Sequence, residues 1–311
     1  MAGDMEVIGE MFKGLMPALV TPFDEQGELD LRATGEILER HIEAGVDGVV
    51  ALGSTGEFSH LDGDERRYFA EQVAEKIEGR VPLIVGVGAS GTREAVSLAR
   101  HAESAGADAV VAVSPFYWKV GEEALFRHFA TISEAVSIPA IIYNFPMLTG
   151  VDLSPALVRR VAGECPNVAG IKDTVTEYIH TVNVIREVKP VRPDFAVLVG
   201  FEDQILPSLL AGSDGAVSGL SNITPELFVG LVRAFEGGDL EKAAELHRRI
   251  LSLMTMHGLS DPGLGATKLA MRKVGVPISP TVRGPALPAT PEAHAAIEAA
   301  LEGAGLTPVS G

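Results

Sequence analysis

The 311-residue chain contains 46% hydrophobic and 22% charged residues, and its formal net charge at pH 7 is -17. This length and hydrophobic share allow one large barrel or two ordinary domains with a sizeable core. The acidic excess argues against nucleic acids and anionic membranes as partners, because both require a basic surface.

The cysteine content and the first residues of the sequence indicate the cellular compartment in which the protein is expected. Cys165 is the single cysteine, which excludes an internal disulfide and a thiolate metal cluster. Residues 1–6 lack the basic and apolar regions of a signal peptide, and no apolar run approaches the roughly 18 residues of a membrane span. We therefore expect a protein of the reducing cytoplasm without a membrane partner.

Short apolar runs of six or seven residues recur through the first two-thirds of the chain. They do not alternate cleanly between apolar and polar residues, which is typical of parallel strands buried on both faces. The runs are residues 14–20, 47–52, 83–88, 108–114, 138–144, 167–173, 195–200 and 214–219.

Amphipathic helical patterns occupy gaps between these runs, at residues 31–44, 64–77, 92–105, 122–135, 154–162, 203–210 and 224–235. Alternating strands and helices predict a (β/α)8 barrel over residues 1–236. A dinucleotide-binding sheet is disfavoured, because the one Gly-x-Gly-x-x-Gly match, at residues 86–91, overlaps the third run instead of following the first.

The pattern changes after Gly238. Helices are expected at residues 239–257, 266–274 and 291–303, with a Pro/Gly-rich loop and a Pro-rich crossing between them. We predict that residues 237–311 form a helical region packed on the barrel.

Lys172 stands near the end of the sixth run, one residue before Asp173, where a buried strand would deliver its side chain into a pocket. Lost hydration favours the neutral amine, which can attack a ketone and form a Schiff base. The other lysines fall in helical or loop stretches, where a solvated ammonium is the expected state; they are Lys13, Lys76, Lys119, Lys189, Lys242, Lys268 and Lys273.

Polar residues follow the other runs, and in a barrel these strand ends meet at one face. Gly53, Ser54 and Thr55 offer hydroxyls and backbone N–H groups suited to a carboxylate or phosphate, or else form a capped tight turn. Glu57, which follows them, is expected to be a cap or a supporting acid.

Tyrosines and acids at strand ends extend the candidate site. Tyr143 is predicted to face Lys172 from a strand about 5 Å away and to move protons, or else to be an ordinary packed tyrosine. Tyr117 has the same two interpretations. Glu202 and Asp203 could bind the hydroxyls of a polyol or cap a helix. Gly200 and Ser218 complete the candidate substrate-binding positions. No metal-ligand spacing is present.

The motifs at residues 53–57, Tyr143-Asn144-x-Pro146 and Gly170-x-Lys172-Asp173 resemble the dihydrodipicolinate synthase / N-acetylneuraminate lyase family of class I Schiff-base aldolases. The resemblance implies a (β/α)8 barrel with a C-terminal helical extension, usually a homotetramer built as a dimer of dimers. It implies that Lys172 forms a Schiff base with an α-keto acid, usually pyruvate, and that no cofactor is required.

The same resemblance implies roles for the neighbouring residues. Tyr143 matches the proton-shuttling tyrosine, and Ser54 and Thr55 match the pair that holds the carboxylate and relays protons. Tyr117 matches a tyrosine that, in the synthases, reaches the neighbouring subunit's site.

One position indicates the branch of the family. The synthases carry an arginine two residues after the proline, to bind the second substrate's carboxylate, and here Leu148 stands in its place. An apolar side chain cannot replace that clamp. Residues 115–120, 143–146 and 170–174 instead resemble the 2-keto-3-deoxy sugar acid aldolases, which cleave such an acid to pyruvate and an aldehyde.

Several alternatives remain open at this point. Dihydrodipicolinate synthase, N-acetylneuraminate lyase and a keto-deoxy sugar acid dehydratase would use the same site. A non-catalytic keto-acid-binding barrel belongs to another class, but the combination of Lys172 with Tyr143, Ser54 and Thr55 argues against it. A phosphate-binding barrel enzyme is disfavoured because residues 212–219 make a poor anion loop.

Overall fold

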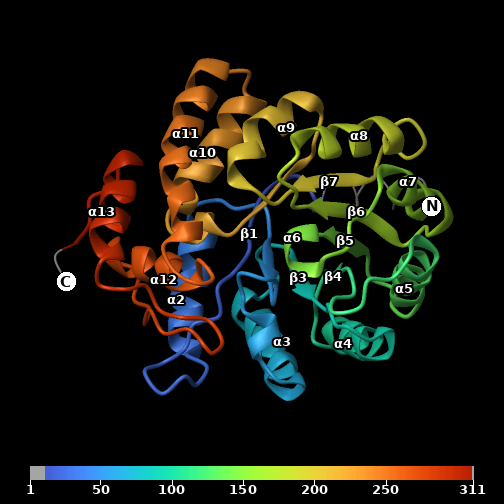
Figure 1. The fold of residues 1–311 in the computed structure, drawn as a ribbon, viewed down its shortest axis with the longest axis horizontal. Helices are drawn as coiled ribbons and strands as arrows, with labels where there is room; N and C mark the ends of the chain where they lie inside the picture. Colours follow the sequence, from blue (N-terminus) through green and yellow to red (C-terminus); the bar gives the residue numbers. More distant parts are fainter. Residues whose placement is uncertain (1–10, 310–311) are drawn as a thin grey trace.

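The computed structural model describes residues 11–309 of the chain, so the start considered above for a signal peptide, residues 1–6, lies outside them. A sheet of eight parallel strands forms the centre of the molecule, and the predicted (β/α)8 barrel is confirmed (Figure 1). The strands are β1 (Gly14–Pro17), β2 (Val49–Ala51), β3 (Leu83–Gly86), β4 (Ala109–Val113), β5 (Ala140–Asn144), β6 (Val168–Asp173), β7 (Ala196–Val199) and β8 (Gly215–Ser218).

The eight strands pair in an order that forms a nearly closed barrel. The order is β1-β8-β7-β6-β5-β4-β3-β2, and each adjacent pair is parallel. Just beyond β1, Ala18 forms a parallel bridge with Val50 of β2, and the Leu19 N–H donates to the Val50 carbonyl at 2.9 Å. These contacts join the two ends of the sheet, so all strand C-termini meet at one mouth.

Each predicted apolar run contains a strand, and every strand residue is buried. Most strands are shorter than their runs, because the apolar residues continue into the loops. Leu52, for example, is predicted as strand, but its φ of 57° turns the chain out of β2. That turn starts the loop with Ser54 and Thr55.

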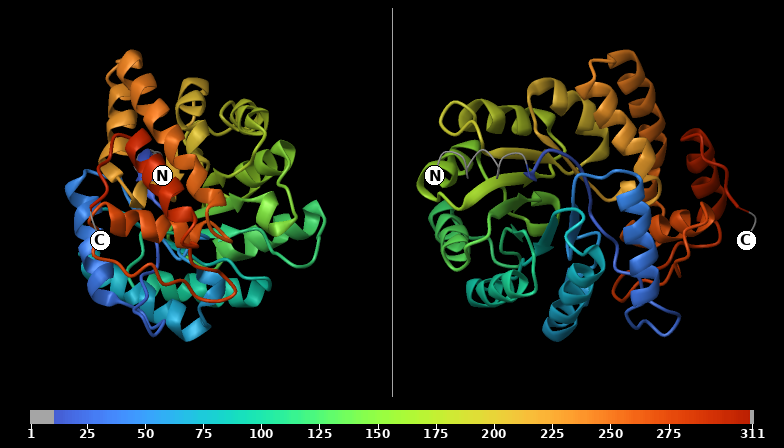
Figure 2. Two further views of the ribbon diagram at one scale, coloured as in Figure 1. Left: turned by 60° about the vertical axis from the view of Figure 1, so that its left-hand side comes forward. Right: turned by 180° about the vertical axis from the view of Figure 1, so that it is seen from behind.

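Helices surround the barrel on its outer face (Figures 1 and 2). They are α2 (Leu31–Glu43), α3 (Gly63–Ile77), α4 (Thr92–Ser104), α5 (Glu122–Glu134), α6 (Pro146–Thr149), α7 (Pro155–Glu164), α8 (Tyr178–Val188), α9 (Ile205–Ala211) and α10 (Pro225–Glu236). Side-chain caps begin several of them. Asp62 forms a reciprocal capping box with Glu65 at α3, and Ser154 accepts from the Leu157 N–H at α7.

The sequence patterns do not single out α8. Its buried residues, Thr181, Val184, Ile185 and Val188, have helical spacing, but Ile179 adds an apolar residue that is 59% exposed. This blurs the polar face, and β-branched residues weaken the helical signal further. The helix expected over 203–210 divides into a 3-10 turn, η2 (Glu202–Gln204), and α9.

The C-terminal region consists of α11 (Leu240–Leu253), the 3-10 segment η4 (Met254–Gly258), α12 (Leu264–Lys273) and α13 (Ala293–Gly303). In Figures 1 and 2 the orange-to-red elements gather on one side of the barrel. Leu253, Ile297 and Leu301 belong to the same hydrophobic cluster as Leu231 of α10, so these helices share the outer core of the barrel. The domain boundary at residue 236 stays a prediction. No helix within residues 11–309 has the length and apolar character needed to cross a membrane.

Candidate active site

Lys172 and Tyr143 lie side by side inside the barrel. They are register partners on β6 and β5, and Lys172 is also the register partner of Leu198 on β7. Tyr143 and Leu198 belong to the cluster that fills the barrel interior, so Lys172 points inward with them. The exposed fractions of Lys172 and Tyr143 are 5% and 4%, and the Lys172 Nζ lies 4.3 Å from the centre of the Tyr143 ring.

The partners of Lys172 distinguish it from an ordinary buried lysine. Within residues 11–309, no aspartate or glutamate forms an ion pair with its Nζ. The ammonium form would therefore rely on the face of an aromatic ring, which stabilises a cation less than a buried carboxylate does.

Loop 53–56 follows β2 and makes a tight turn at the barrel mouth. The hydroxyl of Thr21 donates to the Gly56 carbonyl at 2.6 Å. A Cβ on Gly56 would lie 3.0 Å from the Leu19 carbonyl oxygen, so the backbone requires glycine there. Thr55 packs close to Gly219 after β8, where an added Cβ would lie 2.8 Å from the Thr55 Oγ1. Gly53 is buried in this loop, while Ser54 and Thr55 are partly exposed.

Glu57, directly after loop 53–56, holds this segment against the C-terminal region. Its carboxylate accepts from the Lys268 Nζ at 2.6 Å and from the backbone N–H of Arg283 at 3.0 Å. It is only 1% exposed. The expected supporting acid is thus placed under the loop with Ser54 and Thr55.

The prediction of a solvated Lys268 is wrong. Its side chain is fully buried, its Nζ also donates to the Thr281 carbonyl at 2.9 Å, and it lies 4.4 Å from the centre of the Phe23 ring. Burial lowers the pKa of Lys268, and the charge and hydrogen bond of Glu57 oppose this effect. Glu57 lies 211 positions from Lys268 in the sequence, so only the folded chain brings its carboxylate to the buried ammonium of Lys268. That carboxylate offsets the cost of burying the charge.

Tyr117 is exposed, unlike the buried Lys172 and Tyr143. It is 85% exposed, its φ of 80° is in the left-handed region, and its ring meets that of Trp118 edge-on, with centroids 5.6 Å apart. Trp118 is 74% exposed. The exposed rings of Tyr117 and Trp118 are accessible to a neighbouring molecule, and the role of Tyr117 in the site stays a prediction.

Glu202 is placed inside a set of hydrogen bonds. It accepts from the Ser218 Oγ at 3.0 Å, from the Leu220 N–H at 3.0 Å, and from the His257 Nε2 at 3.1 Å. Burial would raise the pKa of Glu202, but the hydrogen bond and charge of His257 outweigh it and lower the pKa. Asp203 is exposed, so the two adjacent acids have different environments.

Gly200 places the end of β7 against the segment that follows Lys172. A Cβ at Gly200 would lie 1.8 Å from the Thr174 Oγ1, so only glycine fits at this position. Ser218 ends β8 and is bound to Glu202. The structure therefore brings Gly200 and Ser218 to the barrel mouth as strand-end residues, while their contact with a substrate stays a prediction.

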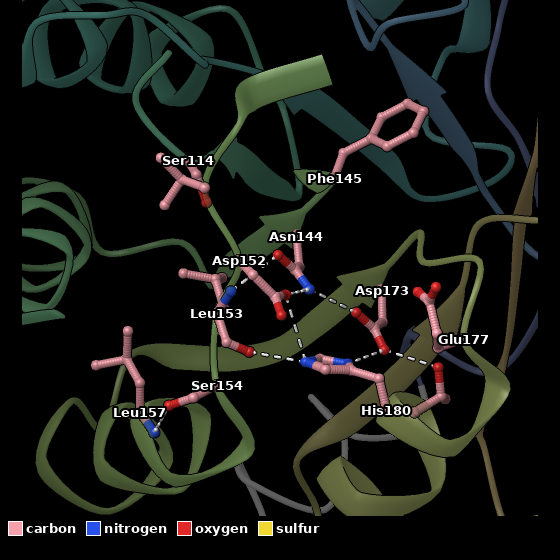
Figure 3. Close-up of polar contacts among 12 residues, drawn as sticks. Ser114, Asn144, Phe145, Asp152, Leu153, Ser154, Leu157, Asp173, Glu177 and His180 are labelled. Carbon is pink, nitrogen blue, oxygen red and sulfur yellow. Dashed lines mark hydrogen bonds and ion pairs between the residues drawn. The ribbon is translucent and has the colours of Figure 1, made fainter. Parts of the chain in front are cut away.

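Sequence reasoning missed a polar network behind β5 and β6 (Figure 3). It includes Asn144, Asp173 and His180, joined by hydrogen bonds of 2.9 and 3.0 Å to the Asp173 carboxylate. One signal was present: Asn144 and Asp173 each follow an inward-facing residue, so both point outward from buried strands, where apolar side chains are usual.

Comparisons with known proteins agree with this geometry. A model of the Dihydrodipicolinate synthetase family matches residues 11–304. The probable 2-dehydro-3-deoxy-D-pentonate aldolase YjhH of Escherichia coli (strain K12) is 41% identical over 298 residues, which are 96% of this chain and 99% of that protein. The 4-hydroxy-tetrahydrodipicolinate synthase of Hyphomonas neptunium is 39% identical, over 95% of this chain and 99% of that protein.

A solved structure matches equally well. The crystal structure of YagE from E. coli K12, a prophage protein of the dihydrodipicolinic acid synthase family in complex with pyruvate, has a TM-score of 0.93. It is 39% identical and covers 95% of this chain and 99% of that chain. The barrel and these matches define a lyase of the class I aldolase type. The chain belongs to the dihydrodipicolinate synthetase family, which confirms the resemblance drawn from its motifs.

Proposed function

We propose that this protein is a Schiff-base aldolase that cleaves a 2-keto-3-deoxy sugar acid to pyruvate and an aldehyde. One observation carries the proposal: Lys172 is buried against the Tyr143 ring and has no carboxylate partner within the described residues. A buried amine beside a phenol provides both a nucleophile and a group that moves protons.

The chemistry follows from these two side chains. The Lys172 amine attacks the C2 carbonyl of the substrate, and loss of water gives an iminium. Tyr143 removes the proton of the C4 hydroxyl, the C3–C4 bond breaks, and its electron pair moves to the iminium as an enamine while the aldehyde leaves. Protonation of C3 and hydrolysis then release pyruvate and restore the amine. The lysine provides the electron sink, so the reaction requires no metal or organic cofactor.

Loop 53–56 is the proposed site for the substrate carboxylate. Ser54 and Thr55 offer hydroxyls there, and the tight turn presents backbone N–H groups at the barrel mouth. This arrangement fixes the keto acid at one end and leaves its C4 end directed away from loop 53–56.

The apolar side chain of Leu148 favours a sugar acid over aspartate semialdehyde as the second half of the substrate. Leu148 lies on α6 directly after β5 and is 60% exposed. It offers no charge to a second carboxylate. The similarity to YjhH, the probable 2-dehydro-3-deoxy-D-pentonate aldolase, supports this choice. The similarity to a 4-hydroxy-tetrahydrodipicolinate synthase is the reason to test the condensation as well.

We further propose a homotetramer in the reducing cytoplasm, built as a dimer of dimers in which Tyr117 enters the neighbouring subunit's site. The 85% exposure of Tyr117 and the 74% exposure of Trp118 support an interface at this surface. Mass photometry of the wild type and of Tyr117→Ala tests it: the wild type should be a tetramer, and a monomeric wild type would contradict the assembly.

The test of the reaction is pyruvate release from a panel of substrates by purified protein. We expect release from 2-keto-3-deoxypentonate or 2-keto-3-deoxygluconate, and little condensation of pyruvate with aspartate semialdehyde. Leu148→Arg is the matched variant, because it should improve the condensation and impair the cleavage. Efficient condensation by the wild type, without cleavage of any sugar acid, would contradict the proposal and favour the synthase.

A further inference from the structure

The Asp173 carboxylate, on the outer side of β6, is fully buried and fully hydrogen-bonded (Figure 3). Its Oδ1 accepts from the Asn144 Nδ2 at 2.9 Å. Its Oδ2 accepts from the Thr181 Oγ1 at 2.7 Å and bonds the His180 Nδ1 at 3.0 Å. Both carboxylate oxygens of Asp173 therefore face hydrogen-bond donors, and this geometry gives Asp173 an accepting role.

The second ring nitrogen of His180 also faces an acceptor. Its Nε2 lies 3.0 Å from the Leu153 carbonyl oxygen and 3.5 Å from the Asp152 Oδ1. A neutral imidazole has one N–H and can satisfy only one of these two sides, whereas an imidazolium donates to both. Burial alone would lower the pKa of His180, but the hydrogen bond and charge of Asp173, with the charge of Asp152, raise it.

Within residues 11–309, Asp152 of the loop before α7 is the other charged residue that acts on His180 besides Asp173 of β6. At the start of α8, Glu177 is exposed and accepts from the Thr176 hydroxyl. The charged residues of α7 lie at the surface, and α9 has none; those of α7 are Arg159, Arg160 and Glu164.

The network lies directly behind Lys172 and Tyr143. Asn144 and Asp173 form the register pair that follows Tyr143 and Lys172, and adjacent residues on a strand point to opposite faces. Asn144 also accepts from the Leu153 N–H at 3.1 Å, which connects the strand ends to the loop after α6. Hydrogen bonds from β5, β6, α8 and this loop therefore fix the backbone that carries Lys172 and Tyr143.

The charges of the network also act on the Lys172 amine. A buried carboxylate one residue from Lys172 would, if uncompensated, favour the ammonium over the reactive amine. We propose that Asp173 and His180 form a positioning pair: it fixes the ends of β5 and β6, and His180 compensates the Asp173 charge behind Lys172, which favours reaction of Lys172 as an amine. This inference rests on the proposed function, since it assigns the pair to the same lysine.

Three variants separate charge from structure. His180→Gln keeps hydrogen-bonding groups but leaves the Asp173 charge uncompensated, Asp173→Asn removes the carboxylate, and the double variant carries neither charge of the pair; Asp152 is unchanged in all three. The readout is the pH profile of Lys172 labelling by formaldehyde and cyanoborohydride, followed by peptide mass mapping. His101→Gln is the matched control, because His101 pairs with Glu71 on the outer helices, at 2.9 Å.

We expect His180→Gln to move the labelling midpoint of Lys172 up by about one pH unit, the size expected for one unscreened charge at an effective dielectric of about 20. The double variant should return it to within about 0.3 unit of the wild type. The inference would be overturned if the labelling midpoint of Lys172 were unchanged in His180→Gln. It would also be overturned if the double variant had the same raised midpoint as His180→Gln.

A measurement on the wild type covers the case in which these variants fail to fold. An NMR titration of the histidine rings should show a midpoint for His180 above the ordinary histidine pKa; a midpoint at or below that pKa would refute the pair. Neither measurement requires pyruvate. Absence of a pyruvate adduct on Lys172 would therefore refute the proposed function separately from the positioning pair.

Discussion

Lys172 and Lys268 are both buried lysines, yet their surroundings differ. Lys172 is the penultimate residue of β6 and faces the Tyr143 ring, whereas Lys268 lies on α12 and is bound to Glu57 at 2.6 Å. Their exposed fractions are 5% and 0%. Burial is therefore similar, and the presence of a carboxylate partner is what differs. Under the proposed mechanism, Lys172 is distinguished from Lys268 by the lack of a carboxylate partner within residues 11–309 more than by its burial.

The largest effect on activity is expected from removing the Lys172 amine. We expect Lys172→Ala to reduce pyruvate release at least about a thousand-fold, because the covalent step is lost. Steady-state kinetics with a 2-keto-3-deoxy sugar acid provides the measurement. Lys242→Ala is the control, since Lys242 lies at the surface of α11 with Glu245. Retained activity in Lys172→Ala would remove this lysine from the mechanism.

Removing Lys268 should act on stability instead. Lys268→Met leaves the Glu57 carboxylate buried without its cation, and we expect a loss of about 3–5 kcal/mol in the free energy of unfolding. Urea denaturation measures it. Lys268→Met combined with Glu57→Gln should lose less than Lys268→Met alone, because no uncompensated charge remains. A single variant as stable as the wild type would show that the pair contributes nothing.

Tyr143→Phe sharpens the account of Lys172, because it keeps the ring beside the amine and removes only the hydroxyl. We expect kcat for sugar acid cleavage to fall about a hundred-fold, the usual contribution of a positioned acid–base group. The pyruvate adduct on Lys172 should still form. Rapid-quench trapping separates the two steps, and unimpaired cleavage would exclude Tyr143 as the group that takes the C4 hydroxyl proton.

Glu202 is a second buried carboxylate with a basic partner, but this partner, His257, is partly exposed. The accessible fraction of the His257 side chain is 42%. Burial alone would lower the pKa of His257, but Glu202 raises it. The contribution of His257 is therefore complete below its ordinary pKa and is lost as the pH rises through the raised value. The contribution of Glu202 is lost as the pH falls through its lowered pKa.

For this pair we expect His257→Gln to cost about 0.5 kcal/mol at pH 6, discounted for solvent screening, and less at pH 8.5. Denaturation at the two pH values gives the difference between wild type and variant. A cost that grows toward pH 8.5 would have the wrong sign and would show that His257 acts through packing.

The sequence predicted what local patterns encode. Lys172 and Tyr143 stand at the ends of apolar runs, so their meeting follows from strand geometry alone. Lys268 was misjudged, because its environment depends on a glutamate 211 positions away and on a C-terminal region whose packing no local pattern specifies. The pairing of Asp173 with His180 was missed for a related reason: His180 lies on α8, whose mixed apolar faces conceal the helix.

The central claim is that Lys172, and not the more deeply buried Lys268, is the nucleophile. Borohydride reduction in the presence of pyruvate, followed by intact-mass measurement and peptide mapping, tests it most directly. The account predicts one pyruvyl adduct per chain, on Lys172, and none on Lys268. An adduct on Lys268, or no adduct on folded protein in large excess of pyruvate, would contradict it.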